Sequence, residues 1–327
     1  MASPYHNLAQ LLLDCLDRDY NSFEELLSAY FSHLDQSIKI GNDAQRQIQK
    51  SRAKYSLHPL LSCFVNDCLK DGIDIEKGGA RYNWIMPSFV GMGNLVDSLY
   101  AIKTLIFDKK ELTFAQLKTA LDNNFVGFEA LRRQLLYGVQ KYGNDDDDVD
   151  KYYVIITNHI ISECKKYSGE HKNGNVVPSV FCWEMHMRFG LDTGATPDGR
   201  VAGFPLGDGS GPCQGREHSG PTASIISSTK WDHHELIGGV AVNMKFSKNS
   251  LGEQSLDTML SIIKTYLVRG GFEIQINVLD ASDLEKAKKN PELYRDLVVR
   301  VGGYSDYFTR LTPQMQDEVI LRTAHKI

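Results

Sequence analysis

Residues 238–280, GGVAVNMKFSKNSLGEQSLDTMLSIIKTYLVRGGFEIQINVLD, decide the fold class. Two runs within this stretch, 238–246 and 270–278, have apolar residues at every second position, which is the period of a strand with one buried face. Between them, residues 255–268 have apolar residues three and four positions apart, the period of a helix. A strand, a helix and a strand in this order predict an α/β protein, either layered or a barrel.

The second face of each predicted strand is strongly polar. The first strand carries Asn243 and Lys245 there, and the second carries Gln275 and Asn277. In a barrel surrounded by helices the apolar faces point outward, so these polar side chains would line the interior. We therefore predict Asn243, Gln275 and Asn277 as lumen-lining residues. An open sheet with one solvated face explains these two strands equally well when they are considered alone.

The composition is that of a globular protein, with 327 residues, of which 42% are hydrophobic and 24% charged. A net charge of -5 argues against nucleic acid, whose binding proteins carry a basic surface. The sequence has no apolar run of the roughly 18 residues that a membrane helix needs, and acidic residues interrupt the apolar N-terminal stretch, unlike in a signal peptide. We expect a cytoplasmic protein with no nucleic-acid or membrane partner, and with six reduced cysteines.

Helical periodicity dominates residues 1–175, whereas residues 176–327 alternate between strand-like and helical runs. The strand-like runs include 177–190 (VPSVFCWEMHMRFG) and 222–228 (TASIISS). We therefore predict a mainly helical part followed by a β-rich part, together forming one structural unit.

Several local signals mark where elements begin. Ser22 and Thr113 are each followed within three positions by Glu or Gln, which predicts a helix N-cap at both. The acidic run 144–150 lacks the glycine and distal glutamate of a calcium loop, so we expect a helix N-terminus there. The loop 190–221 is rich in glycine and proline and is long for a plain connection, which is typical of a structural or site-lining loop.

Residues 297–311, LVVRVGGYSDYFTRL, end a strand-like run on two glycines, Gly302 and Gly303. A turn or bulge that needs a positive φ explains an isolated pair of this kind. A second explanation is chemical. An α-carbon without a side chain can lose a hydrogen atom and become planar, and its unpaired electron is then shared with the flanking amide groups. Such a radical persists only in a pocket from which water is excluded.

The segment 297–323, LVVRVGGYSDYFTRLTPQMQDEVILRT, resembles the C-terminal signature of glycyl radical enzymes, the superfamily of pyruvate formate-lyase and glycerol dehydratase. The matching positions are Arg300, Gly303, Tyr304, Phe308, Leu311, Gln316, Arg322 and Thr323. Other segments resemble family blocks in the family's order: GGARYNW at 78–84, GATPDGR at 194–200, GPTASI at 220–225 and NMKF at 243–246.

This resemblance implies that Gly303 is the radical carrier, and so the catalytic residue, while Arg300, Gly302 and Tyr304 support the radical loop. It implies the C-terminal half of a ten-stranded α/β barrel with a helical N-terminal part and the glycyl radical loop inside the barrel. The glycyl radical domain would span approximately 200–327. An S-adenosylmethionine and iron-sulfur activating enzyme would install the radical, and this chain itself would bind no cofactor and no metal.

One family feature is missing from this sequence. Family members carry a cysteine in a GC[VI]E-like block upstream of everything matched above, and no cysteine here has those neighbours. We expect a partner chain, the N-terminal half of the enzyme, to supply that cysteine. Cys182, in a predicted strand with Glu184 on the same face, is the internal alternative for a thiyl radical. The expected activity is radical cleavage of a C-C, C-O, C-N or C-S bond in a small-molecule substrate, by a lyase, dehydratase or decarboxylase that acts as a hetero-oligomer in anaerobic metabolism.

Two alternatives remain at this point. The chain could be a spare-part repair protein that replaces an oxygen-damaged glycyl radical domain, although such modules cover little more than that domain. It could also be a degenerate, non-catalytic assembly subunit, although Arg300, Gly303 and Tyr304 are intact.

Overall fold

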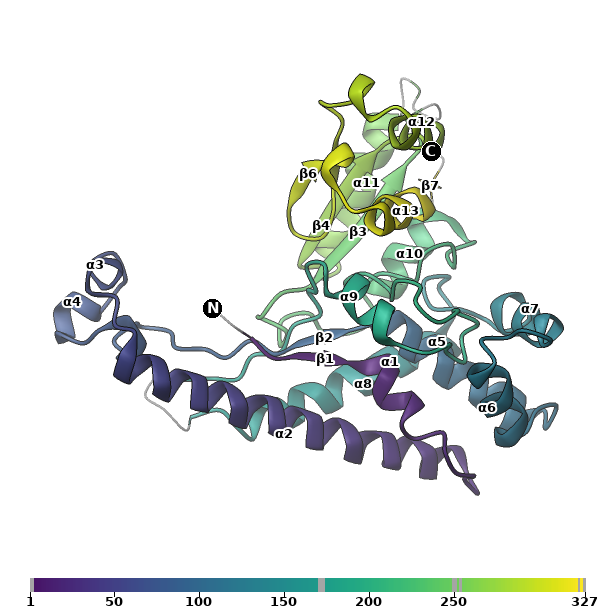
Figure 1. Ribbon diagram of the computed structural model, residues 1–327, viewed down its shortest axis with the longest axis horizontal. Helices are drawn as coiled ribbons and strands as arrows, with labels where there is room; N and C mark the ends of the chain where they lie inside the picture. The colour runs from purple at the N-terminus through teal and green to yellow at the C-terminus, as the bar shows by residue number, and fades with distance from the viewer. Residues whose placement is uncertain (1–2, 170–173, 249–251, 253–254, 323, 326–327) are drawn as a thin grey trace.

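The computed structural model describes residues 3–169, 174–248, 252, 255–322 and 324–325. Helices form most of the first half, and five of the seven strands in the described residues lie after residue 240 (Figure 1). The strands are β1 (Tyr5–Asn7), β2 (Ser88–Val90), β3 (Ala241–Phe246), β4 (Glu273–Val278), β5 (Val298–Arg300), β6 (Ser305–Tyr307) and β7 (Ala324–His325). The α-helices are α1 (Leu8–Leu13), α2 (Phe23–Tyr55), α3 (Pro59–Ser62), α4 (Cys68–Asp71), α5 (Met92–Ile102), α6 (Phe114–Asp122), α7 (Glu129–Tyr137), α8 (Asp147–Lys165), α9 (Met185–Asp192), α10 (Gly220–Ser228), α11 (Ser255–Val268), α12 (Ala281–Lys289) and α13 (Pro313–Leu321).

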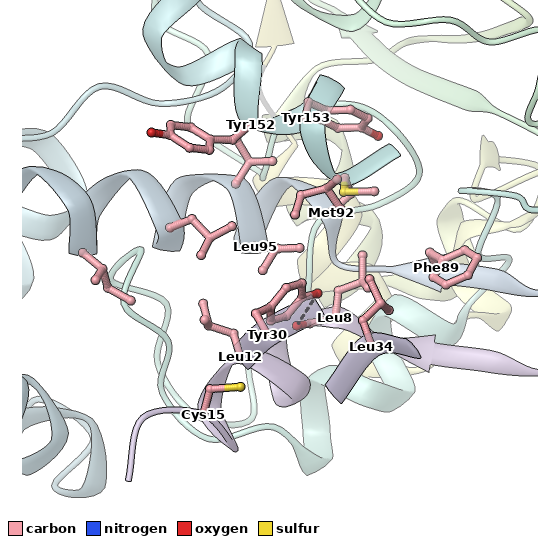
Figure 2. Close-up of a cluster of buried hydrophobic side chains, with 14 of the residues drawn as sticks. Leu8, Leu12, Cys15, Tyr30, Leu34, Phe89, Met92, Leu95, Tyr152 and Tyr153 are labelled. Atoms are coloured by element: carbon pink, nitrogen blue, oxygen red, sulfur yellow. Dashed lines mark hydrogen bonds between the residues drawn. The ribbon is translucent and has the colours of Figure 1, made fainter. Parts of the chain in front are cut away.

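The largest hydrophobic cluster lies between α1, α2, α5 and α8 (Figure 2). Leu8 and Leu12 from α1 face Tyr30 from α2, whose hydroxyl lies 3.5 Å from the Leu8 carbonyl oxygen. The three-and-four spacing seen in the sequence therefore places one face of each helix in a shared core. Within the described residues, no helix combines the length and the apolar character needed to span a bilayer.

The predicted helix starts are confirmed. The Ser22 side chain accepts a hydrogen bond from the Glu25 amide (3.1 Å), which caps α2. Thr113 and Gln116 form a capping box at the start of α6. The acidic run opens α8, where Asp146 is the N-cap and its carboxylate accepts from the Asp148 amide. Side-chain acceptors satisfy amides that have no partner within the helix.

Most of the paired strands are parallel. β1 pairs with β2, and β3 pairs with β4 and β7, all in parallel. Isolated parallel bridges join Ser88 of β2 to Ser179, and Ser179 to Gly239, just before β3. Parallel pairing therefore links β1, β2, the segment at Ser179, β3 and β4 in this order. Within the described residues the strands form separate sheets of two, three and two strands, so the mixed α/β class is confirmed, while the half of a ten-stranded barrel that the resemblance implied stays a prediction.

The β3–α11–β4 unit forms as predicted. Val242 pairs with Ile274 and Met244 with Ile276 on the apolar face, which packs on Ile262 and Tyr266 of α11 in a separate hydrophobic cluster. On the other face, Asn243 lies opposite Gln275, and Lys245 lies opposite Asn277. Because the strand period is two, this register gathers the polar side chains on one side of the sheet.

Two predicted strands are wrong. Residues 222–228 lie in α10, where Pro221 occupies the first turn and the Thr229 hydroxyl donates to the Ile225 carbonyl (2.8 Å). Proline is pre-set for a first turn, and hydroxyl bonds to carbonyls one turn back are compatible with a helix.

Residues 177–190 also do not form the predicted strand over their length. The Met185 amide donates to the Cys182 carbonyl (2.8 Å), Trp183 has φ +51°, and α9 begins at Met185. Cys182 and Glu184 therefore do not share a strand face. Within the mainly helical part, residues 59–71 form two short helices, α3 and α4, and Asp67, just before α4, has φ +74°.

The glycine-rich loop between α9 and α10 makes a backbone contact that predicts a strong substitution effect. Gly209 has φ +60°, and a methyl group there would lie 2.3 Å from the Ala241 carbonyl oxygen in β3. Gly203 has φ +77°, with no atom within 4 Å of such a methyl. We expect Gly203→Ala to reduce the free energy of unfolding by about 1 kcal/mol, from the positive φ alone, and Gly209→Ala by about 3 kcal/mol or more, because a clash is added. Urea unfolding measures both, and equal losses would contradict the close approach.

His6 in β1 predicts a pH dependence of stability. The ring is buried, it stacks on Phe89 (centroids 4.9 Å apart), and its Nδ1 lies 2.8 Å from the Ser37 hydroxyl. Burial lowers the pKa of His6 from 6.5 to about 4. Since the unfolded chain binds a proton at the higher pH, stability falls as the pH drops from 6.5 to 4, by on the order of 3 kcal/mol for this group. His6→Phe should remove that part of the slope in urea unfolding at pH 7 and pH 4.5, and an unchanged slope would show that His6 is not its source.

Candidate functional site

The two glycines form the tip of a β-hairpin. β5 and β6 are antiparallel, with Arg300 opposite Ser305, and the Val301 amide donates to the Tyr304 carbonyl (2.9 Å) across the tip. Gly303 has φ +83°, and a methyl group on it would lie 1.8 Å from Phe181 Cζ. A methyl group on Gly302 would lie 2.6 Å from the Trp183 carbonyl oxygen. Both positions therefore exclude a side chain, and Gly303 also needs the positive φ that glycine tolerates.

Side chains from β4 hold the hairpin. The Gln275 Oε1 atom accepts hydrogen bonds from the Gly303 amide (3.1 Å) and from Arg300 Nε (3.0 Å). Asn277 pairs with the backbone of Arg300, donating to its carbonyl (3.0 Å) and accepting from its amide (2.8 Å). The structure therefore brings two of the three polar residues singled out on the sheet into direct contact with the glycine hairpin.

The third polar residue, Asn243, contacts the glycine-rich loop instead. Its Nδ2 donates to Oδ2 of Asp208 (2.5 Å). The same carboxylate accepts from Cys182 Sγ (3.2 Å) and from Arg322 Nη2 (3.2 Å). Oδ1 of Asp208 also lies 3.5 Å from the position of a methyl group on Gly302. Sequence reasoning missed Asp208, and the available signal was an acid flanked by Gly207 and Gly209 in a loop already expected to line a site.

Arg322, at the end of α13, also binds the hairpin backbone. Nη1 donates to the Arg300 carbonyl (3.1 Å), and Nη2 donates to the Val301 carbonyl (2.8 Å). Glu318 forms an ion pair with the same guanidinium (2.9 Å). Burial would lower the pKa of Arg322, but Glu318 and Asp208 raise it above its usual value. The sequence match included Arg322 but did not indicate this contact, and the matched Thr323 lies outside the described residues.

Cys182 lies beside the hairpin but is directed at Asp208. Its chain neighbours, Phe181 and Trp183, supply the atoms that crowd the two glycines, and the Trp183 ring stacks on Tyr304 with centroids 6.2 Å apart. Burial and the Asp208 carboxylate raise the pKa of Cys182, although His186 opposes them. The sulfur is therefore held as a thiol that donates to a carboxylate.

Two buried clusters contain residue types that bind metals. One consists of Cys182, His186 and Asp208, and the other of Asp97, Asp198 and Cys213. In the first cluster Arg322 already pairs with Asp208. In the second, burial raises the pKa of Asp97 to about 7, and Lys141 opposes that rise. Each cluster thus has a basic side chain that supplies positive charge to its acids.

Two family models match the chain. The model described as pyruvate formate lyase-like matches residues 9–190, and the one described as glycine radical matches residues 206–309, which include the hairpin.

Characterised relatives agree with these matches. Trans-4-hydroxy-L-proline dehydratase of Clostridioides difficile is 39% identical over 310 residues, which cover 94% of this chain and 39% of the relative. Isethionate sulfite-lyase of Bilophila wadsworthia is 35% identical over 318 residues, with 94% and 38% covered. The chain thus spans about two fifths of the length of these relatives.

Solved structures show the same fold. The glycerol-bound B12-independent glycerol dehydratase from Clostridium butyricum superposes with a TM-score of 0.94 at 35% identity, over 99% of this chain and 43% of that one. The hydroxyproline dehydratase from Clostridioides difficile also gives a TM-score of 0.94, at 36% identity and with the same coverage. The resemblance seen at residues 297–323 is therefore confirmed, and the chain belongs to the glycyl radical enzyme family.

Proposed function

We propose that this chain stores an organic radical on the α-carbon of Gly303 and passes it to a cysteine thiol that begins radical cleavage of a small molecule. The observation that carries this proposal is the environment of that carbon. It has no room for a side chain, its amide is fixed by Gln275, and it stands at the tip of a hairpin within the residues matched by the glycine radical model. The relatives that act as dehydratases and lyases support bond cleavage of the lyase type.

In this proposal an S-adenosylmethionine and iron-sulfur activating enzyme removes one hydrogen atom from Gly303. The α-carbon then becomes planar, and the amide groups on either side share the unpaired electron. Gln275 holds the Gly303 amide, so the planar segment keeps a fixed orientation. Arg300 and Tyr304 support the loop through Gln275 and Trp183 respectively. Holding the reacting atom in one geometry is what allows transfer to a second group.

A partner chain is the proposed source of the cysteine. Gly303 is only half-buried, whereas a carbon radical requires a dry surrounding. Apolar side chains near the hairpin are also exposed: Trp183 by 49%, Val298 by 48% and Tyr307 by 37%. A polypeptide that covers this surface would exclude water from Gly303 and could complete the barrel around the loop. We propose that it carries the cysteine loop, which makes the active enzyme a hetero-oligomer.

Replacing Gly303 tests the radical site. After anaerobic treatment with the activating enzyme, we expect the wild-type chain to show an electron paramagnetic resonance doublet from the single remaining α-hydrogen. Gly303→Ala should lack this doublet, because alanine has a Cβ that would collide with Phe181. Gly215→Ala is the matched control, since Gly215 also has a positive φ but has open space around it. A doublet of wild-type intensity in Gly303→Ala would place the radical on another residue.

Replacing Cys182 locates the thiol. Ser keeps a donor toward Asp208 but cannot form a thiyl radical, so we expect Cys182→Ser to retain the doublet and to change turnover of the assembled enzyme by less than about tenfold. The measurement is product formation together with radical quantification in the same samples. An intact doublet with complete loss of turnover would instead place the thiyl radical in this chain.

A further inference from the structure

We propose that Arg322 is a positioning residue that latches the glycine hairpin in its packed position, and that Asp208 and Glu318 hold the latch in place. This inference rests on the proposed role of Gly303, but the hydrogen-exchange measurement that tests it needs no radical.

Arg322 binds the last two carbonyl oxygens before Gly302. The planar guanidinium spans both, at 3.1 Å to Arg300 and 2.8 Å to Val301. The other side chains described as binding the backbone of the hairpin tip, Gln275 and Asn277, are neutral amides. Hydrogen bonds from a charged donor are stronger than those from a neutral one. The guanidinium therefore makes the strongest side-chain hydrogen bonds to the backbone of the hairpin tip.

The latch is itself fixed by buried groups. Asp208 accepts from Arg322 and is held by Asn243 and Cys182. Glu318 accepts from Arg322 through both carboxylate oxygens, at 2.9 to 3.2 Å.

The helix that carries Arg322 is fixed at the same end. Lys245 donates to the carbonyls of Val319 (3.3 Å) and Ile320 (2.8 Å) at the end of α13. A cation at that end satisfies carbonyls with no partner within the helix and interacts favourably with the helix dipole. Arg322 is thus anchored independently of the hairpin.

The charge of Arg322 stays compensated when the hairpin leaves. The buried guanidinium keeps its ion pairs with Glu318 and Asp208 whether or not the Arg300 and Val301 carbonyls are present. A buried charge without a partner would oppose movement strongly. Opening breaks the two hydrogen bonds that Arg322 makes to the hairpin but leaves the guanidinium paired, so its charge does not prevent the hairpin from swinging out to an activating enzyme and returning. The hydrogen bonds from Arg322 therefore set the equilibrium between the packed hairpin and the hairpin that has swung out.

Hydrogen exchange on the unactivated full chain tests this inference. Arg322→Gln should speed exchange of the backbone amides of residues 301–304 by about tenfold or more, because it removes charged hydrogen bonds from the packed state. Arg322→Lys should have a smaller effect in the same direction, since an ammonium lacks the planar fork that spans two carbonyls. Arg310→Gln is the matched control, because Arg310 is exposed and lies over the Tyr307 ring (4.7 Å).

The outcomes separate the latch from the proposed function. Faster exchange confined to the hairpin in the Arg322 variants, with unchanged exchange in α2 and α8, supports the latch even if no radical forms. Exchange equal to that of wild type or of Arg310→Gln overturns it, even if the wild-type doublet is present. Where the doublet forms, the Arg322 variants should also lose it about tenfold faster in air, because the open hairpin exposes the radical carbon. If Arg322→Gln does not fold, the comparison of Arg322→Lys with Arg310→Gln decides.

Discussion

The carboxylate of Asp208 is the group on which the site depends. It lies in the loop between α9 and α10 and accepts hydrogen bonds from Cys182, Asn243 and Arg322. These donors come from the segment before α9, from β3 and from the end of α13, so one small group joins three distant parts of the chain. A buried carboxylate is tolerated only when such donors surround it. The loop, the sheet and the last helix therefore cannot be positioned independently of one another.

Local patterns in the sequence predicted the elements whose formation is itself local. Alternation placed β3 and β4, and the caps at Ser22 and Thr113 placed two helix starts, because the partners lie within a few residues. The same logic misassigned α10, where serine and threonine hydroxyls bond to helix carbonyls and conceal the helical character. The contact between Asp208 and Arg322 spans 114 positions. No local pattern encodes it, and only the complete fold brings the two together.

Acidic and basic side chains are buried together near the hairpin. Asp208 and Glu318 face Arg322 and His186, which are all nearly inaccessible to solvent. Burial would lower the pKa of His186, but the Asp208 carboxylate raises it above its usual value. Such an arrangement tolerates few alternatives, because removing any one member leaves another uncompensated.

The hairpin is rooted in a hydrophobic cluster separate from the main helical core. Seven of the eight buried side chains in that cluster come from residues 284–319, and Met187 is the eighth. The segment that bears the glycines thus brings most of its own packing with it. A chimaera joined between β4 and α12 would therefore keep this cluster nearly whole, and the donor and recipient would have to match at the contacts of Arg322 with Asp208 and of Gly303 with Phe181.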